Sequence, residues 1–189
     1  MAEALHEWAR SLPDLHSQGW KRLVRGVNDR RAAGRHPTLA TVDAQGMPQA
    51  RTVVLRAADP QAGILRVYTD RHAPKVAEVG AHPHAALHIW DKDAHLQLRI
   101  LAGVAVRTGE PVADLWQRIP EHARCNYGTL PGPARPIDEG LGYQRVPNFD
   151  DFAVLELTVE SMELLHLGYQ HRRARFHRSD DWAGQWLAP

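Results

Sequence analysis

Two arginines, Arg51 and Arg56, stand at the ends of the apolar hexapeptide RTVVLR. Side chains alternate between the two faces of an extended strand, so the two arginines point to opposite sides. At roughly 3.3 Å per residue they lie about 17 Å apart. One arginine could therefore hold a phosphate while the other lies near a ring at the far end of the same ligand. A strand with charged ends at the solvent boundary is the structural alternative.

A second group of polar residues follows the next apolar segment, where Tyr68 and Thr69 end a predicted strand and Lys75 comes six residues after Thr69. Pro74 is typical of the first turn of a helix, so Lys75 is expected near a helix start. The free amides and the positive end of the helix dipole favour an anion there. A threonine hydroxyl, a lysine and an arginine together predict a phosphate site. A solvated lysine after a proline is the simpler alternative.

Gln97 and Arg99 lie two residues apart in a third apolar-alternating segment and so share a face. An amide carries both a donor and an acceptor, which suits the imide edge of a flavin ring. A nearby cation would stabilise the negative charge of a reduced ring. A polar pair on an exposed edge strand is the alternative.

The arginine-rich segment HRRARFHR, residues 171–178, is the last candidate. A nucleic-acid patch is one interpretation, but the segment alternates like a strand and the net charge of the chain is only +1. His171, Arg173 and Arg175 then share a face and suit a phosphorylated ligand.

Bulk properties exclude several other classes. Of the residues, 43% are hydrophobic and 24% charged, which is ordinary for a globular protein. The 12 histidines are scattered and the one cysteine, Cys125, has no partner in the sequence, so neither a metal site nor a disulfide is expected. No signal peptide and no membrane-spanning run is recognisable, so a cytoplasmic protein without nucleic-acid or membrane partners is expected. Hydrolase, NTPase and dinucleotide-fold motifs are not found.

Hydrophobic periodicity predicts helices early in the chain and short strands afterwards. Helices are expected over 3–12 and Ser17–Ala33, with Ser17 as N-cap and Gly34 ending the second, and over Pro74–Ala81, Glu110–Arg118 and Glu121–Tyr127. Strands are expected over 39–43, 49–56, 64–69, 85–91, 95–107, 152–159, 162–167, 173–178 and 185–187. Residues 130–147, rich in proline and glycine, are expected to form an irregular excursion. Many short antiparallel strands favour a barrel. One domain is expected over 1–189, with a helical layer at 1–35 and the barrel at 36–189.

From about Thr38 to the C-terminus, the order and spacing of these segments resemble the pyridoxamine 5'-phosphate oxidase family. The resemblance implies a six-stranded antiparallel Greek-key split barrel, an FMN cofactor and a homodimer with FMN at the subunit interface. The residues implied to bind FMN are Arg51, Thr52, Val53, Val54, Leu55, Arg56, Tyr68, Thr69, Lys75, Gln97 and Arg175. Arg175 would come from the partner subunit and the others from one subunit, with the 130–147 excursion reaching across. Arg124, His171 and Arg173 are the candidates for substrate contact, and no side chain is assigned as an acid-base catalyst.

Three departures from the family pattern bear on function. His171-Arg-Arg173 reverses the family order of arginine and histidine, Leu165 replaces a tryptophan that covers the flavin, and the family's substrate-phosphate region is only loosely matched by Arg124, Tyr127 and Thr129. In the FMN motif, Pro74 also replaces a basic residue before Lys75. These departures favour an FMN-dependent oxidoreductase of a divergent subgroup. A true pyridoxamine 5'-phosphate oxidase and a non-catalytic flavin- or heme-binding module are the alternatives, and F420 in place of FMN is also left open.

Overall fold

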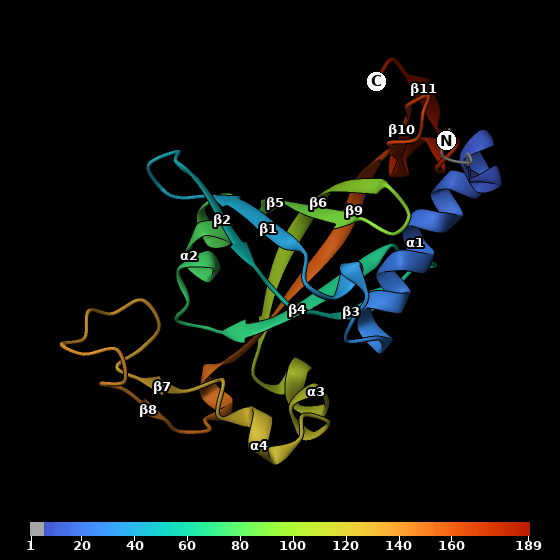
Figure 1. The fold of residues 1–189 in the computed structure, drawn as a ribbon. Helices are drawn as coiled ribbons and strands as arrows, with labels where there is room; N and C mark the ends of the chain where they lie inside the picture. Colours follow the sequence, from blue (N-terminus) through green and yellow to red (C-terminus); the bar gives the residue numbers. More distant parts are fainter. Residues whose placement is uncertain (1–5) are drawn as a thin grey trace.

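A computed structural model describes residues 6–189. Its centre is a nine-stranded antiparallel sheet that curls into a split barrel (Figure 1). The strands are β1 (Thr38–Val42), β2 (Pro48–Thr52), β3 (Leu55–Asp59), β4 (Ile64–Asp70), β5 (His84–Asp91), β6 (Leu96–Thr108), β9 (Phe152–His166), β10 (Arg172–His177) and β11 (Gln185–Leu187). The antiparallel split-barrel class expected from the sequence is confirmed, although the sheet has more than the six strands expected.

The long strand β9 organises the barrel. It pairs with β6 along its whole length, while its other edge pairs first with β4 and then with β10. A bulge interrupts the β6–β9 ladder between Leu101 and Ala102. The sequence predicts two strands across this region, because polar residues at Glu160 and Ser161 interrupt the apolar run. The bulge leaves Glu160 as an extra, unpaired residue, so β9 continues through this region as one strand.

Most strands bury one face, as their alternating patterns predict, whereas the first residues of β9 are buried on both faces. Leu96, Leu98 and Ile100 of β6 are fully buried, and so are Leu155 and Leu157 of β9. These side chains form the main core inside the barrel. A second, smaller core lies on the other side of β9, where Phe152 and Val154 meet Trp116 and Tyr127.

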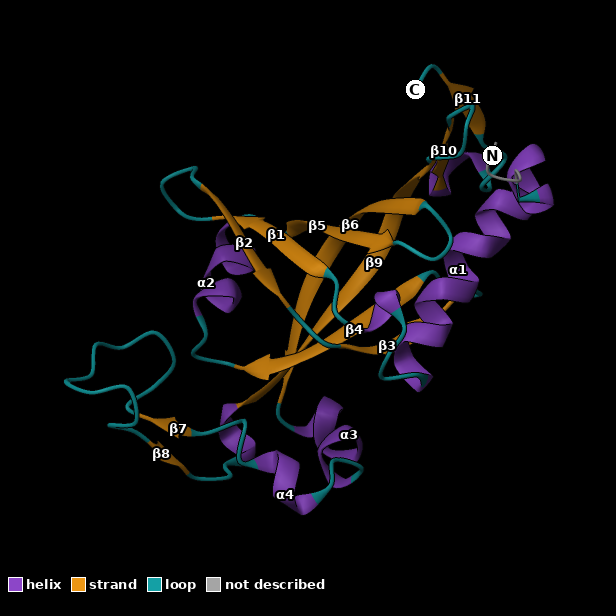
Figure 2. Cartoon of the chain, viewed as in Figure 1, coloured by secondary structure: helices purple, strands orange, loops and turns teal. Residues whose placement is uncertain are grey.

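Helices cover the barrel at three places (Figure 2). They are α1 (Leu12–Asn28), α2 (Pro74–Ala81), α3 (Ala113–Gln117) and α4 (Glu121–Arg124), with short 3₁₀ turns η1 (Glu7–Arg10), η2 (Ala33–Arg35), η3 (Glu110–Val112), η4 (Phe149–Asp151) and η5 (Arg178–Asp180). Helix α1 packs against β3 and β9, and α2 packs against β1 and β6. None of the helices in residues 6–189 is long and apolar enough to cross a membrane.

The start of α1 differs from the sequence prediction. The helix begins at Leu12, because the Ser11 side chain accepts a hydrogen bond from the Asp14 amide at 3.2 Å and Pro13 lies in the tolerant first turn. Ser17 is therefore inside the helix and is not its N-cap. The helix ends at Asn28 rather than at Ala33, and Gly34 lies in η2. Residues 3–5 of the expected first helix lie outside the described residues, and 7–10 form η1.

The excursion at 130–147 forms an arm away from the barrel (Figure 1). Two short strands, β7 (Thr129–Leu130) and β8 (Gln144–Arg145), pair at its base. Along the arm, Leu130, Ile137, Leu141, Tyr143 and Val146 are exposed. The irregular loop expected from its proline and glycine content is found.

Candidate functional site

Arg51, Thr69 and Lys75 converge near the start of α2, although they come from β2, β4 and α2. The Lys75 ammonium donates to the Thr69 hydroxyl at 3.1 Å. The Arg51 guanidinium donates to Glu78 on the next turn of α2 at 2.7 Å and also to the Thr41 hydroxyl. We call Arg51, Thr69 and Lys75 the cradle. It gathers two cations and a hydroxyl, the donor set that a phosphate needs.

The charges of the cradle are close enough to influence one another. Burial lowers the pKa of the Lys75 ammonium, and the positive charge of Arg51 lowers it further, while the carboxylates of Glu78 and Asp70 act in the opposite direction. Two cations held close together in a half-buried site repel each other. A bound anion would relieve that repulsion, so the electrostatics of the cradle favour an anionic ligand.

Residues 51–56 do not form the single extended strand expected from the sequence. Strand β2 ends at Thr52, Val53 and Val54 connect it to β3, and β3 begins at Leu55. Arg56 is the extra residue of a bulge between Leu55 and Ala57. A bulge changes the direction of a side chain, and the Arg56 guanidinium lies 5.9 Å from the centre of the Tyr68 ring. Arg56 therefore belongs to a different pocket from Arg51.

That pocket has a volume of about 150 Å³ and lies between β3, β4 and the α3–α4 segment. Its polar lining consists of Arg56, Arg118, Tyr68 and Tyr127, and we call it the Arg56 pocket. Burial raises the pKa of the Tyr127 phenol, against the opposing charge and hydrogen bond of Arg56. Tyr127 therefore stays a neutral donor at neutral pH. Two guanidinium groups and two phenols suit a small anionic group such as a phosphate or carboxylate.

Gln97 lies on the opposite face of the sheet from the cradle. Its neighbours Leu96 and Leu98 point into the core, so Gln97 points outward, beside its partners Trp90 and Leu165 on the adjacent strands. Arg51, in contrast, is in register with the fully buried Leu39 and shares the inner face with it. The expectation that one subunit presents both Arg51 and Gln97 to one ligand is therefore wrong for this geometry, because the pleat separates their side chains.

Arg99, Arg173 and Arg175 lie on the same outer face as Gln97 and share one carboxylate. Glu163 of β9 accepts from Arg99 at 3.1 Å, from Arg173 at 2.9 Å and from Arg175 at 3.4 Å. We call Gln97 and these three arginines the outer-face set. One carboxylate opposite three guanidinium groups leaves an excess of positive charge on this face.

The remaining substrate candidates are less favourably placed. Arg124 donates to the carbonyls of Ile119 and Gln117 and lies over the Trp116 ring at 5.4 Å, so its guanidinium stabilises the α3–α4 turn. That Arg124 contacts substrate stays a prediction, because the two carbonyls use only two of the five N–H donors of its guanidinium. His171 is exposed in the turn before β10, so of the three residues expected to share a strand face only Arg173 and Arg175 are in the strand.

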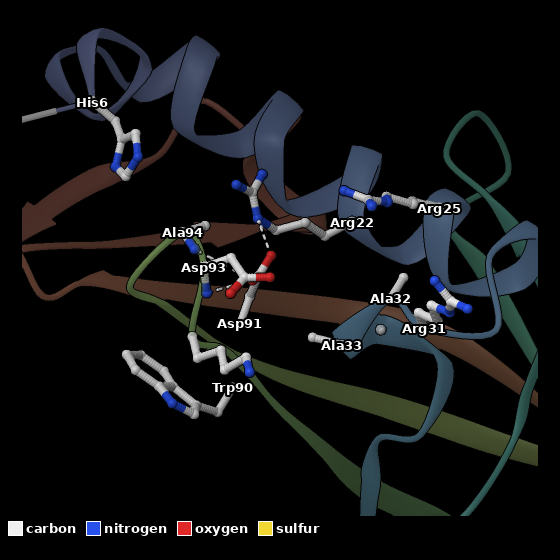
Figure 3. A pocket seen from close by; sticks show the side chains of 12 residues that line it. His6, Arg22, Arg25, Arg31, Ala32, Ala33, Trp90, Asp91, Asp93 and Ala94 are labelled. Atoms are coloured by element: carbon white, nitrogen blue, oxygen red, sulfur yellow. Dashed lines mark hydrogen bonds and ion pairs between the residues drawn. The ribbon is translucent and has the colours of Figure 1, made fainter.

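A further cavity outside these groups lies between α1 and the β5–β6 turn (Figure 3). It has a volume of about 460 Å³. Arg22 forms an ion pair with Asp91 at 2.9 Å across it, and Arg25, Arg31 and Asp93 also line it. Its lining mixes both signs of charge and contains none of the residues predicted to bind a ligand.

Comparison with known proteins identifies the kind of cofactor-binding domain to which this part of the chain corresponds. Residues 17–108 match the family model of the pyridoxamine 5'-phosphate oxidase FMN-binding domain. This segment contains the whole cradle and Gln97. The matched segment, residues 17–108, belongs to the FMN-binding domains of the pyridoxamine 5'-phosphate oxidase family.

Individual relatives agree with this assignment. A pyridoxine/pyridoxamine 5'-phosphate oxidase from Microcystis aeruginosa is 36% identical over 114 residues, which are 60% of this chain and 51% of that one. The chain therefore matches about half the length of that relative. A solved pyridoxamine 5'-phosphate oxidase-related, FMN-binding protein from Nostoc punctiforme superposes with a TM-score of 0.74 at 23% identity, covering 98% of this chain and 99% of that one. PhzG from Burkholderia lata, in complex with tetrahydrophenazine-1-carboxylic acid, gives 0.76 at 18% identity, with coverage of 100% and 99%.

The residues of the cradle fit the cofactor of this FMN-binding family. The terminal phosphate of FMN needs cationic and hydroxyl donors, and Arg51, Lys75 and Thr69 supply them at one place. Pro74 occupies the first turn of α2, so a basic side chain is lost there without disturbing the helix start. Residues 6–189 contain no group of three or more side chains that could hold a metal ion.

Three side chains of these sites were not predicted from the sequence. Glu78 lies one helical turn after Lys75 in a helix that was predicted, so the i, i+3 spacing was the available signal. Glu163 is a lone acid in an apolar segment opposite three arginines. Arg118 of the Arg56 pocket gives no sequence signal, because only the folding of α3–α4 onto β4 brings it to Arg56.

Proposed function

We propose that this chain is an FMN-dependent oxidoreductase that acts as a homodimer on a small molecule with an anionic group. When bound, FMN supplies hydride transfer to or from its ring. The chain itself supplies placement and charge. The cradle binds the phosphate of the cofactor, and the Arg56 pocket binds the anionic group of the substrate.

The observation that carries the proposal is the division of the predicted FMN residues between two faces. The cradle lies on the inner side of β2 and β4, while Gln97 and Arg175 lie on the outer face. One flavin can use both sets only if the outer-face set comes from a second chain. In a two-fold dimer each chain would contribute both sets, one to each of two equivalent sites.

The position of the Arg56 pocket supports an anionic substrate. Thr69 and Tyr68 are consecutive residues of β4, so they face opposite sides, with Thr69 in the cradle and Tyr68 in the pocket. The cradle and the pocket thus lie near the same end of β4, one on each side of the strand, and a molecule anchored by Arg56 and Arg118 would reach the cofactor around that end. Such an anchor fixes orientation, which is the main contribution a protein makes to cofactor chemistry.

Oxidation of pyridoxamine 5'-phosphate is the second candidate function. The phenols and guanidinium groups of the Arg56 pocket are suited to a phosphate ester, and the matched relative from Microcystis carries that enzyme's name. The reversed order of His171 and Arg173 and the leucine at position 165 weigh against it. Release of hydrogen peroxide from pyridoxamine 5'-phosphate and oxygen, measured at saturating FMN, decides between the two.

The test of the main proposal begins with the purified protein. We expect the visible absorbance of oxidised flavin, FMN as the bound small molecule by mass spectrometry, and bleaching of the absorbance by a nicotinamide or deazaflavin donor. A colourless protein that takes up no added FMN would refute the proposal. Flavin that binds but is reduced by no donor would favour a carrier, and a heme spectrum would favour the heme-binding alternative.

A further inference from the structure

Glu78 is a buried carboxylate inside a site built for an anion. Its residue is 8% exposed, and it lies one turn after Lys75 on the same side of α2. The Thr41 hydroxyl, itself 3% exposed, donates to the Glu78 carboxylate, and Arg51 donates to both groups. A buried carboxylate is costly unless it is paired and hydrogen-bonded. Here both conditions are met by Arg51 and Thr41.

These contacts fix the direction of the Arg51 guanidinium. Its two terminal nitrogens are bound separately, Nη2 to the Glu78 carboxylate at 2.7 Å and Nη1 to the Thr41 hydroxyl. A guanidinium has five N–H donors, so donors remain for a further acceptor. The closed arrangement of Arg51, Thr41 and Glu78 holds a long, flexible side chain in one position before any ligand arrives, which lowers the entropy cost of binding.

The same carboxylate weakens the attraction of the cradle for a phosphate. Without Glu78, the positive charges of Arg51 and Lys75 would match a doubly charged phosphate monoester. The Glu78 carboxylate reduces the net charge of the group and stands near the place where the phosphate would bind. At such short range in a half-buried site, repulsion between like charges is substantial.

We propose that Glu78 is the positioning residue of the cradle, which aims Arg51 at the FMN phosphate and at the same time limits how tightly the phosphate is held. The inference depends on the proposal that Arg51 and Lys75 bind this phosphate. Positioning and charge are separable, because glutamine keeps an oxygen acceptor at the same position but carries no charge.

The test compares Glu78→Gln and Glu78→Ala with the wild type, each titrated with FMN and with riboflavin, which lacks the phosphate. We expect Glu78→Gln to bind FMN about tenfold more tightly, because one like charge is removed. We expect Glu78→Ala to bind FMN about tenfold more weakly, because Arg51 loses its anchor. Riboflavin affinity should stay at the wild-type value in Glu78→Gln, so the ratio of the two affinities reports on the phosphate alone.

A pH series adds a readout that a purely structural role would not change. The Glu78 carboxylate raises the pKa of Lys75, so in Glu78→Gln the loss of FMN affinity with rising pH should begin at a lower pH than in the wild type. Glu156→Gln is the matched control. Glu156 also pairs with two arginines, Arg66 at 3.0 Å and Arg107 at 3.2 Å, but belongs to neither the cradle nor the outer-face set.

Several results would overturn the inference. It fails if Glu78→Gln binds FMN more weakly than the wild type, if FMN and riboflavin affinities change in parallel, or if neither variant changes the ratio. In those cases the wild type still binds FMN and the proposed function stands. If the wild type instead bound riboflavin and FMN with equal affinity, the cradle would not bind the FMN phosphate. The proposed placement of the cofactor would then be refuted as well.

Discussion

At the scale of single residues, the chain concentrates its chemistry in a few charged side chains that the sheet keeps apart. Arg51 and Lys75 lie on the inner face of the sheet, where the Glu78 carboxylate partly neutralises their positive charge. Arg56 faces another pocket, and Arg175 shares Glu163 with two more arginines on the outer face. The three groups of cations have different partners, so substitutions in different groups should have separable effects on cofactor, substrate and stability.

Arg51→Ala and Lys75→Ala should each weaken FMN binding by roughly 1.5–3 kcal/mol, the range for hydrogen bonds to charged groups. Arg51→Ala should also lower the free energy of unfolding, because it leaves the buried Glu78 carboxylate without its cation. Fluorescence titration with FMN and urea unfolding measure the two effects. Lys21→Ala, at an exposed position of α1, is the control. Wild-type affinity in both cradle variants would show that the phosphate binds elsewhere.

FMN affinity should depend on the protonation of Lys75. Its pKa is lowered from the ordinary lysine value of 10.5 by burial and by Arg51. The ammonium is the form that binds phosphate, so affinity should fall as the pH rises through the lowered pKa, at a pH below 10.5. Lys75→Arg should keep its affinity over the same range, because a guanidinium stays charged. Identical pH profiles for wild type and Lys75→Arg would contradict this assignment.

At the scale of elements, two β-bulges and a close contact between glycines determine where the functional side chains and helix α1 lie. The bulge at Arg56 sets the direction of that side chain toward Tyr68, and the bulge at Leu101–Ala102 lies where β9 changes its pairing on the other edge from β4 to β10. Helix α1 is held close to η2 by glycines. At Gly26, an added Cβ would lie 2.3 Å from the Gly34 carbonyl carbon, so only glycine permits this approach.

Gly26→Ala should therefore destabilise the protein by about 1–3 kcal/mol or more, as overpacking against backbone requires. Gly80→Ala is the matched control. Gly80 is also a helical glycine, but an added Cβ there would meet nothing within 4 Å, and the loss of chain entropy on folding becomes smaller. Urea unfolding of the two variants should show opposite changes. An unchanged free energy of unfolding for Gly26→Ala would mean that α1 and η2 separate at little cost.

At the scale of the whole molecule, the proposed homodimer would bring the two groups of predicted cofactor residues together. The inner cradle and the outer-face set cannot meet on one flavin within one chain, because the sheet lies between them. The exposed Trp90 and Leu101 on the outer face, and the exposed apolar side chains of the arm, add surface that a second copy could cover.

Mixing two defective variants tests this assembly. Lys75→Ala and Arg175→Ala should each bind FMN weakly as homodimers. After the two are unfolded and refolded together, a mixed dimer contains one site with both defects and one site with none. Tight FMN binding should therefore return in part of the mixture. Refolding either variant alone provides the control. No recovery in a mixture shown to contain mixed dimers would place both residues in the same chain's site.

The sequence by itself determined the strand-rich antiparallel class, the helix at Pro74–Ala81 and the choice of Arg51, Thr69 and Lys75 as candidate phosphate-binding residues. These depend on local properties, namely side-chain alternation, a proline at a helix start and the chemistry of basic residues near an apolar segment. It also gave the family resemblance on which the FMN assignment depends.

Only the tertiary structure decided which of these residues meet. A bulge between Leu55 and Ala57, invisible in the hydrophobic pattern, sets the direction of the Arg56 side chain, which lies beside Tyr68. The Arg124 guanidinium donates to carbonyls of its own turn. Arg118 lines the Arg56 pocket because α3 and α4 pack there. Gln97 fell on the opposite face from Arg51 because the pairing of β1, β2, β5 and β6 fixes which side each strand presents. Pairing and packing between distant segments are set by the whole chain, so no local pattern specifies them.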